Sequence, residues 1–317
     1  GSFDGDGTLI QNNNAQVTGD TTISTATFDW DGGNGDSTTT VDAGVTLTID
    51  SDAVDRSANN DFDGTLHVGS GATVTVNTAT DWRLDGELNF TNSGAIPHLG
   101  GSATMIVQGD VNVSGGEADI DAPVQFDTAA DVTVAAGAEL EVNGAATVNG
   151  GMYNLDDGTL DFDSTLSIGS TTFNDVGVAD TAEVFFDGIT TYTGGTIGSS
   201  AIITQRGAAT INGATVINGS VVNLDGDGTT TVTLNDDLTI NADSLENSSN
   251  KFDGTLTING RSNELTVNTV SPWVMDGTLE ITTSYTTTYP AISGQDFTLS
   301  GPANIDGGTR FDARVDI

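Results

Sequence analysis

The stretch from Phe62 to Thr78, FDGTLHVGSGATVTVNT, decides the fold class of this chain. Two short runs within it, Thr65–Val68 and Thr73–Val76, alternate apolar with polar residues, and a Gly-Ser-Gly segment separates them. An apolar side chain at every second position is typical of a strand that buries one face, and glycine-rich breaks are typical of turns. The stretch therefore predicts two short β-strands with a tight connection. The Asp-Gly, Asn-Gly, Gly-Gly and Ser-Gly pairs between such runs are expected to supply the positive φ angles that turns need.

The same stretch returns near the end of the chain. FDGTL begins at Phe62 and again at Phe252, and TVNT begins at Thr75 and again at Thr266. A tryptophan and an Asp-Gly pair follow each copy of TVNT. Self-similarity at a fixed spacing indicates a repeat architecture, so the sequence predicts a module of about 190 residues.

A finer spacing is present inside the module. The alternating runs of the first half centre near Leu47, Leu66, Leu88, Val111, Thr133 and Leu155, at nearly even intervals. This spacing suits a parallel β-solenoid (β-helix), in which each coil of about 22 residues stacks on the preceding one. A coil of that length predicts about 14 coils for the whole chain.

Composition favours the solenoid over the alternative, a string of tandem β-sandwich domains. Aromatic residues make up 6% of the 317 residues, there are 41 glycines and no cysteine, and helical periodicity is absent. Few large side chains suit many thin core layers better than one thick core, and asparagine can form side-chain ladders between stacked coils. We therefore expect an all-β, parallel β-solenoid, with sandwich domains of about 95 residues left open.

The repeat also predicts the organisation of the chain. Residues 1–40 are expected to end a preceding repeat unit, residues 41–231 to form one full module with half-units 41–133 and 134–231, and residues 232–317 to form a partial second module. The half-units depend on the similarity between VDAG at 41–44 and VAAG at 134–137. We expect one continuous solenoid, cut from a longer tandem array, with neighbouring copies or flanking repeats of the same protein as partners.

The charge excludes several classes of function. The chain has 7 basic and 45 acidic residues, and its formal net charge is −38. Nucleic-acid binding requires basic residues against phosphate groups, and peripheral binding to anionic membranes requires a basic cluster. The chain has no apolar run long enough to cross a bilayer, so membrane insertion is not expected either. Acidic residues spread along the whole chain predict a well-solvated surface in a salty or calcium-containing exterior.

One acidic turn is a candidate calcium site. The run DGGNGD at 31–36 is similar to a calcium-binding nonapeptide repeat, although its last aspartate lies one place early, and DGDG at 225–228 is its counterpart in the second module. Oxygen-rich turns suit Ca²⁺. The predicted metal ligands are Asp31, Asn34, Asp36, Asp225 and Asp227. The alternative is an ordinary turn, and no other cofactor is expected.

The sequence resembles the β-solenoid repeat regions of large bacterial surface proteins, namely adhesins, haemagglutinin-like filaments and autotransporter passenger stalks. The features that carry the resemblance are the runs GTLTI at 254–258, GATVTV at 71–76 and DLTI at 237–240, the Asp, Thr and Gly bias, and the absence of cysteine. The resemblance implies an extracellular, cell-surface location and a structural or adhesive role.

Two tryptophans are the candidate ligand contacts. Trp82 and Trp273 occupy equivalent places in the two modules, and exposed rings there could stack on a sugar. A carbohydrate-binding adhesin that recognises surface glycans is therefore the alternative function. The other interpretation is that both rings pack inside a coil.

A third hypothesis is a polysaccharide-active β-helix enzyme. Asp161 and Asp163 would share one face of a strand, and paired carboxylates can hydrolyse glycosidic bonds. The basic residues are scattered, so exposed turn acids are the preferred interpretation, and we predict no catalytic residue. The predicted function is a non-enzymatic structural or adhesive segment of an extracellular cell-surface protein, forming a rod, stalk or filament.

Overall fold

A computed structural model describes residues 1–30, 37–54, 60–177, 181–224, 228–246, 250–260, 262–283 and 289–317. This part of the chain is a parallel β-solenoid of about 12 coils, about 23 residues apart, and it contains no helix. The predicted fold class is confirmed, since β-sandwich domains are built from antiparallel sheets. Over the same residues, no helix is long and apolar enough to span a membrane.

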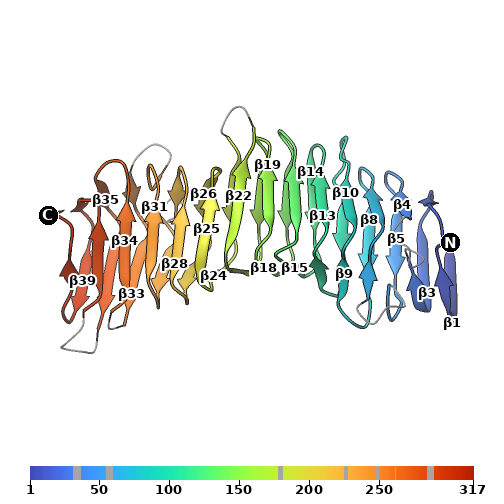
Figure 1. The fold of residues 1–317 in the computed structure, drawn as a ribbon, viewed down its shortest axis with the longest axis horizontal. Coiled ribbons are helices and arrows are strands. Elements are labelled where there is room, and N and C mark those ends of the chain that lie inside the picture. Colours follow the sequence, from blue (N-terminus) through green and yellow to red (C-terminus); the bar gives the residue numbers. More distant parts are fainter. Residues whose placement is uncertain are drawn as a thin grey trace. The chain divides into compact units, whose positions relative to one another are not determined.

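The chain divides into two compact units. Unit 1 contains Gly1–Ser164 and Val176–Val178, and unit 2 contains Thr165–Asp175 and Ala179–Ile317. Within each unit, strands of successive coils lie side by side, from blue to green in unit 1 and from yellow to red in unit 2 (Figure 1).

Unit 1 has three parallel sheets, named here A, B and C. Sheet A has the order β1 (Ser2–Ile10), β3 (Thr21–Asp29), β5 (Thr46–Ile49), β8 (Thr73–Val76), β11 (His98–Gly100), β14 (Glu117–Ile120), β17 (Glu139–Val142) and β20 (Thr159–Phe162). Sheet B has the order β2 (Ala15–Val17), β4 (Thr38–Val41), β7 (Thr65–Val68), β10 (Glu87–Phe90), β13 (Asp110–Val113), β16 (Asp131–Val134) and β19 (Met152–Leu155). Sheet C has the order β6 (Asp61–Phe62), β9 (Trp82–Leu84), β12 (Met105–Val107), β15 (Val124–Phe126) and β18 (Ala146–Val148). From β6 onward, a coil takes one strand from each sheet.

Unit 2 is also built from parallel strands of successive coils, and these strands form four groups. The first has the order β23 (Glu183–Phe186), β26 (Ile202–Gln205) and β29 (Val222–Asn223). The second has the order β22 (Thr171–Asp175), β25 (Gly195–Ser199), β28 (Thr215–Asn218), β31 (Leu238–Asn241), β34 (Glu264–Asn268), β37 (Ala291–Gly294) and β40 (Arg310–Phe311). The third has the order β21 (Leu166–Ile168), β24 (Thr190–Tyr192), β27 (Ala209–Ile211), β30 (Thr231–Leu234), β33 (Thr255–Asn259), β36 (Thr278–Thr282) and β39 (Ala303–Asp306). The fourth has the order β32 (Lys251–Phe252), β35 (Trp273–Met275), β38 (Phe297–Leu299) and β41 (Val315–Asp316).

The register of sheet B confirms the predicted spacing. Leu66 pairs with Leu88, which pairs in turn with Val111, so residues one predicted coil length apart stack in one buried column. Leu47 does not belong to this column, because it lies in sheet A and pairs with Val74. The step from Leu47 to Val74 is longer than the step from Leu66 to Leu88. Because coil length varies in this way, the chain makes fewer coils than expected.

One kind of turn uses glycine for its backbone angle, as predicted for the Gly-Ser-Gly segment, in which Gly71 has a φ of 67°. Gly44 has a φ of 70°, and the turn around it is closed by a hydrogen bond from the Val45 N–H to the Asp42 carbonyl, 3.1 Å long. Gly137, at the matching position of the second half-unit, has a φ of 68°. A side chain at such an angle would be strained, so these two similar stretches form the same turn.

The glycines of the Asp-Gly pairs serve a different purpose. Neither Gly86 nor Gly277 has a positive φ, which corrects the prediction that these pairs supply such angles. A Cβ atom on Gly86 would lie 2.0 Å from the carbonyl oxygen of Gly64, and one on Gly277 would lie 1.9 Å from that of Gly254. These glycines therefore let the backbone of one coil approach that of the preceding coil.

Candidate functional site

The outward faces of the coils carry ladders of asparagine side chains. In unit 1, the Asn112 side-chain amide donates to the Asn89 side-chain oxygen one coil earlier, at 3.1 Å. In unit 2, Asn268 donates to Asn241 at 2.8 Å, and Asn241 donates to Asn218 at 2.7 Å. The parallel register of β28, β31 and β34 places these three residues opposite one another. The expected ladders are present, and each one adds side-chain bonds to the backbone pairing between coils.

A charged side chain joins a similar ladder just after β15 of sheet C. The Asp127 carboxylate accepts hydrogen bonds from Gln108 and Gln125 at 2.8 Å each and from Asn149 at 3.2 Å. Burial raises the pKa of Asp127, but the three amide donors, together with Arg83, outweigh it and leave the pKa below its ordinary value of 3.8. The ionised carboxylate therefore joins side chains from three successive coils.

Both tryptophans considered as ligand contacts are buried. Trp82 and Trp273 are each 1% exposed, at the first position of β9 and β35. Their coils are built alike, since β6 pairs with β9 in unit 1 and β32 pairs with β35 in unit 2. A ring that stacks on a sugar needs an open face. The interpretation as exposed sugar contacts is thus not compatible with the structure, and the packing interpretation accounts for both residues.

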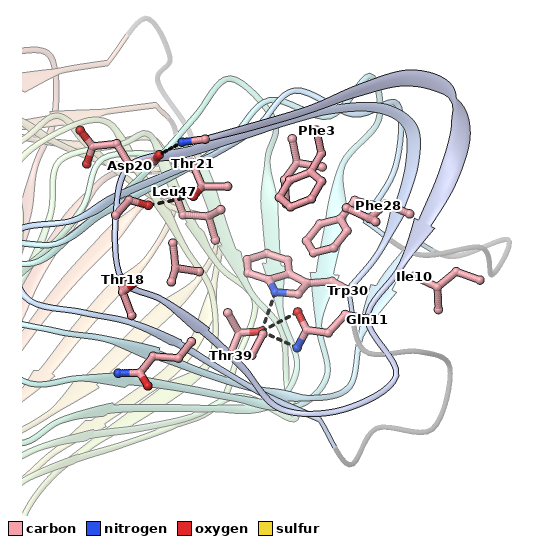
Figure 2. A pocket seen from close by; sticks show the side chains of 17 residues that line it. Phe3, Ile10, Gln11, Thr18, Asp20, Thr21, Phe28, Trp30, Thr39 and Leu47 are labelled. Atoms are coloured by element: carbon pink, nitrogen blue, oxygen red, sulfur yellow. Dashed lines mark hydrogen bonds between the residues drawn. The ribbon is translucent and has the colours of Figure 1, made fainter.

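The indole N–H groups of the tryptophans differ in their partners. The Trp30 Nε1–H donates to the Thr39 hydroxyl at 2.9 Å (Figure 2). The Nε1 atoms of Trp82 and Trp273 are buried, and the described residues offer them no hydrogen-bond partner. A buried donor without an acceptor loses its hydration and gains nothing in return. Sequence reasoning had no signal for this difference, because the acceptor for Trp30 is a tertiary contact.

A cavity of about 710 Å³ lies in the first coils of unit 1. Phe3, Phe28 and Trp30 are among its lining residues, and Phe28 lies between the other two in the close view (Figure 2). Trp30 is fully buried, with its ring centroid 5.7 Å from that of Phe28 and 4.8 Å from that of Phe62. Residues of the paired strands β1 and β3 form much of the lining of the cavity. No sequence feature predicted this cavity.

The predicted calcium ligands cannot be placed. Asp31, Asn34, Asp36, Asp225 and Asp227 lie in segments 31–36 and 225–227, outside the described residues. The calcium site at these turns stays a prediction.

The carboxylates considered for catalysis lie on sheet A. Asp161 is within β20 and points outward, since its neighbours Leu160 and Phe162 are both buried in the core. Asp163 follows the strand and is exposed. Asp161 is only 9% exposed, so the expectation of two exposed turn acids is wrong for this residue. Within unit 1, Asp161 lies opposite Glu141 of the neighbouring strand β17.

No family model, curated protein or solved structure matches this chain.

Proposed function

We propose that the chain is a non-enzymatic structural or adhesive segment of an extracellular cell-surface protein, in which it serves as a rod, stalk or filament. The observation that carries the proposal is the register between coils. Parallel strands pair coil after coil within each unit, and buried apolar columns and outward asparagine ladders follow the same register. Repeated pairing of this kind gives stiffness, because every coil is bonded to its neighbours on both sides.

The charge supports the same proposal. A net charge of −38 keeps copies of the chain apart laterally and keeps a long molecule soluble in a salty exterior. In this proposal the partners are neighbouring copies or flanking repeats of the same protein, joined through coil ends rather than through their sides. The buried Trp82 and Trp273 give no support to the alternative of a glycan-binding module.

Single-molecule force spectroscopy tests the mechanical part of the proposal. The chain is pulled from its two ends, and we expect stepwise unfolding of groups of coils at a reproducible force. Asn241→Ala removes the central rung of the unit 2 ladder and should lower the unfolding force of that unit. Asn304→Ala, on the exposed strand β39, is the matched control and should leave the force unchanged. Unfolding without measurable resistance would contradict the proposal.

Two further measurements test location and the absence of catalysis. An antibody against the chain should label intact source cells as strongly as lysed ones, and labelling only after lysis would contradict an extracellular location. A reducing-sugar assay on acidic and neutral polysaccharides should show no product. Turnover that is lost in Asp161→Asn would instead establish the enzymatic alternative.

A further inference from the structure

Carboxylates gather on the outward face of sheet A in unit 1. The register places His98 opposite Asp119, Asp119 opposite Glu141, and Glu117 opposite Glu139 on neighbouring strands. The inward positions of β14 belong to Ala118 and Ile120, both fully buried, so the acids of that strand point away from the core. The acids on this face include Glu117, Asp119, Asp121, Glu139, Glu141 and Asp163. Two of them, Asp119 and Asp121, have a carboxylate oxygen 3.1 Å and 3.2 Å from the His98 Nδ1 atom.

Three of these side chains have the spacing of a cation site. Glu117, Asp119 and Glu141 each offer one carboxylate oxygen, and these oxygens all lie within 4.8 Å of one another. Calcium holds its oxygen ligands at about 2.3–2.6 Å, so oxygens on opposite sides of one ion are roughly 5 Å apart. Three oxygens this close together can lie around one ion.

Asp119 provides an independent reason to expect a ligand. Its residue surface is 6% exposed, and its Oδ1 atom is buried with no hydrogen-bond partner among the described residues. Its Oδ2 atom lies 3.1 Å from the His98 Nδ1 atom. A buried carboxylate oxygen is very unfavourable unless a charge or donor faces it. A cation bound by Asp119 together with Glu117 and Glu141 would balance the negative charge of this buried oxygen.

The electrostatics of the face agree with this geometry. Burial, opposed by His98, raises the pKa of Asp119 to about 6. Burial, contact with Glu117, and the charges of Asp119 and Asp163 raise the pKa of Glu141 to about 8. In the metal-free protein the repulsion is thus relieved by keeping a proton on the cluster. A divalent ion would relieve the same repulsion while all three groups are ionised.

We propose that Glu117, Asp119 and Glu141 bind a calcium ion on the outward face of sheet A. Calcium prefers carboxylate oxygens, and water can fill the rest of its coordination shell. Because Glu117 and Asp119 lie on β14 and Glu141 on β17, the ion would cross-link two successive coils. The His98 Nδ1 atom lies against Asp119 and Asp121, which leaves the oxygen site free of nitrogen ligands. This site is separate from the turns at 31–36 and 225–227 and does not depend on the proposed structural role.

Calcium titration calorimetry on the whole chain, in about 0.15 M salt to screen diffuse binding, tests the proposal. The wild type should bind one calcium ion at this site. Asp119→Asn and Glu141→Gln should each raise the dissociation constant of that ion by about tenfold or more. The matched control is Asp110→Asn on sheet B, where Asp110 is exposed and lies between Glu87 and Asp131 in the register. The control should bind calcium as the wild type does, because it changes the same net charge outside the cluster.

Melting in chelator and in calcium separates loss of the site from loss of the fold. In chelator, both cluster variants should melt at or above the wild-type temperature, since each replaces an acid of a mutually repelling cluster by a neutral side chain of similar size. In calcium, the wild type and Asp110→Asn should gain more stability than the cluster variants do. Unchanged calcium affinity in the cluster variants would overturn the proposal, as would an equal loss in the control. Zinc binding that depends on His98, without calcium binding, would overturn the calcium assignment.

Discussion

The ring of Trp273 lies nearly parallel to the ring of Phe297, its partner one coil later, with 4.7 Å between centroids and 16° between planes. Both side chains are among the largest buried groups of unit 2. An aromatic pair of this kind contributes about 0.5–1.5 kcal/mol beyond the burial of its area. Trp273, which the sequence left open as a ligand contact, therefore packs between two coils instead.

Replacing the buried tryptophans by phenylalanine should have different effects at different sites. Trp273→Phe keeps an aromatic ring against Phe297 and removes an N–H that has no acceptor among the described residues, whereas Trp30→Phe removes a hydrogen bond to Thr39. We expect Trp30→Phe to lower the free energy of unfolding by about 1 kcal/mol more than Trp273→Phe does. Urea unfolding measures the difference. A larger loss for Trp273→Phe would show that its indole N–H is bonded after all.

Complete removal of the ring provides the reference for that comparison. Trp273→Ala should cost about 3–5 kcal/mol, because it leaves a large cavity against Phe297. A loss below about 1 kcal/mol, the size expected of a surface position, would be incompatible with the burial of this residue.

Gly86→Ala should destabilise unit 1. The new Cβ atom would meet the Gly64 carbonyl oxygen at 2.0 Å, so the two coils would have to separate locally. We expect a loss of about 1–3 kcal/mol in the free energy of unfolding, as for overpacked cores. Gly19→Ala is the matched control, because nothing lies within 4 Å of its Cβ position. Thermal melting compares the two, and equal effects would contradict the close approach of the coils.

Asp127→Asn should make the stability less dependent on acid pH. The folded pKa of Asp127 lies below 3.8, so its ionised form stabilises the fold above that pH, and this stabilisation is lost as the pH falls through the lower folded pKa. At neutral pH the variant should be less stable by about 1 kcal/mol, since three amides lose a charged acceptor. At acid pH, below the ordinary value of 3.8, the difference should shrink. Urea unfolding at both pH values checks this, and a constant difference would show that the charge has no role.

Local pattern was sufficient for much of the fold. The alternation in Thr65–Val68 and Thr73–Val76 became β7 and β8, and the spacing of Leu66 and Leu88 became a stacked pair. The predicted interval of about 22 residues does not hold at Leu47, which pairs with Val74. The alternation of a strand can be seen in the sequence, but the length of the turn between two strands produces no periodic pattern. Local pattern also could not show that Gly86 is needed for the approach of two coils.

The candidate sites were less accessible from the sequence. Trp82 and Trp273 were correctly matched as equivalent positions, but exposure and burial are both compatible with a tryptophan at the start of a strand. The cluster around Asp119 was missed entirely. Its acids are ordinary outward residues in each run, and no local pattern distinguishes them from the many other acids of the chain.

The amino-acid sequence by itself determined that this chain forms short parallel strands in coils, because alternation and turn residues act between near neighbours in the chain. Only the tertiary structure decided which side chains meet across coils. His98 comes one coil before Asp119 in the chain and Glu141 one coil after it, and coil stacking places both on strands next to its own. The burial and charge of Asp119 depend on those neighbours, so its environment exists only once the coils are stacked.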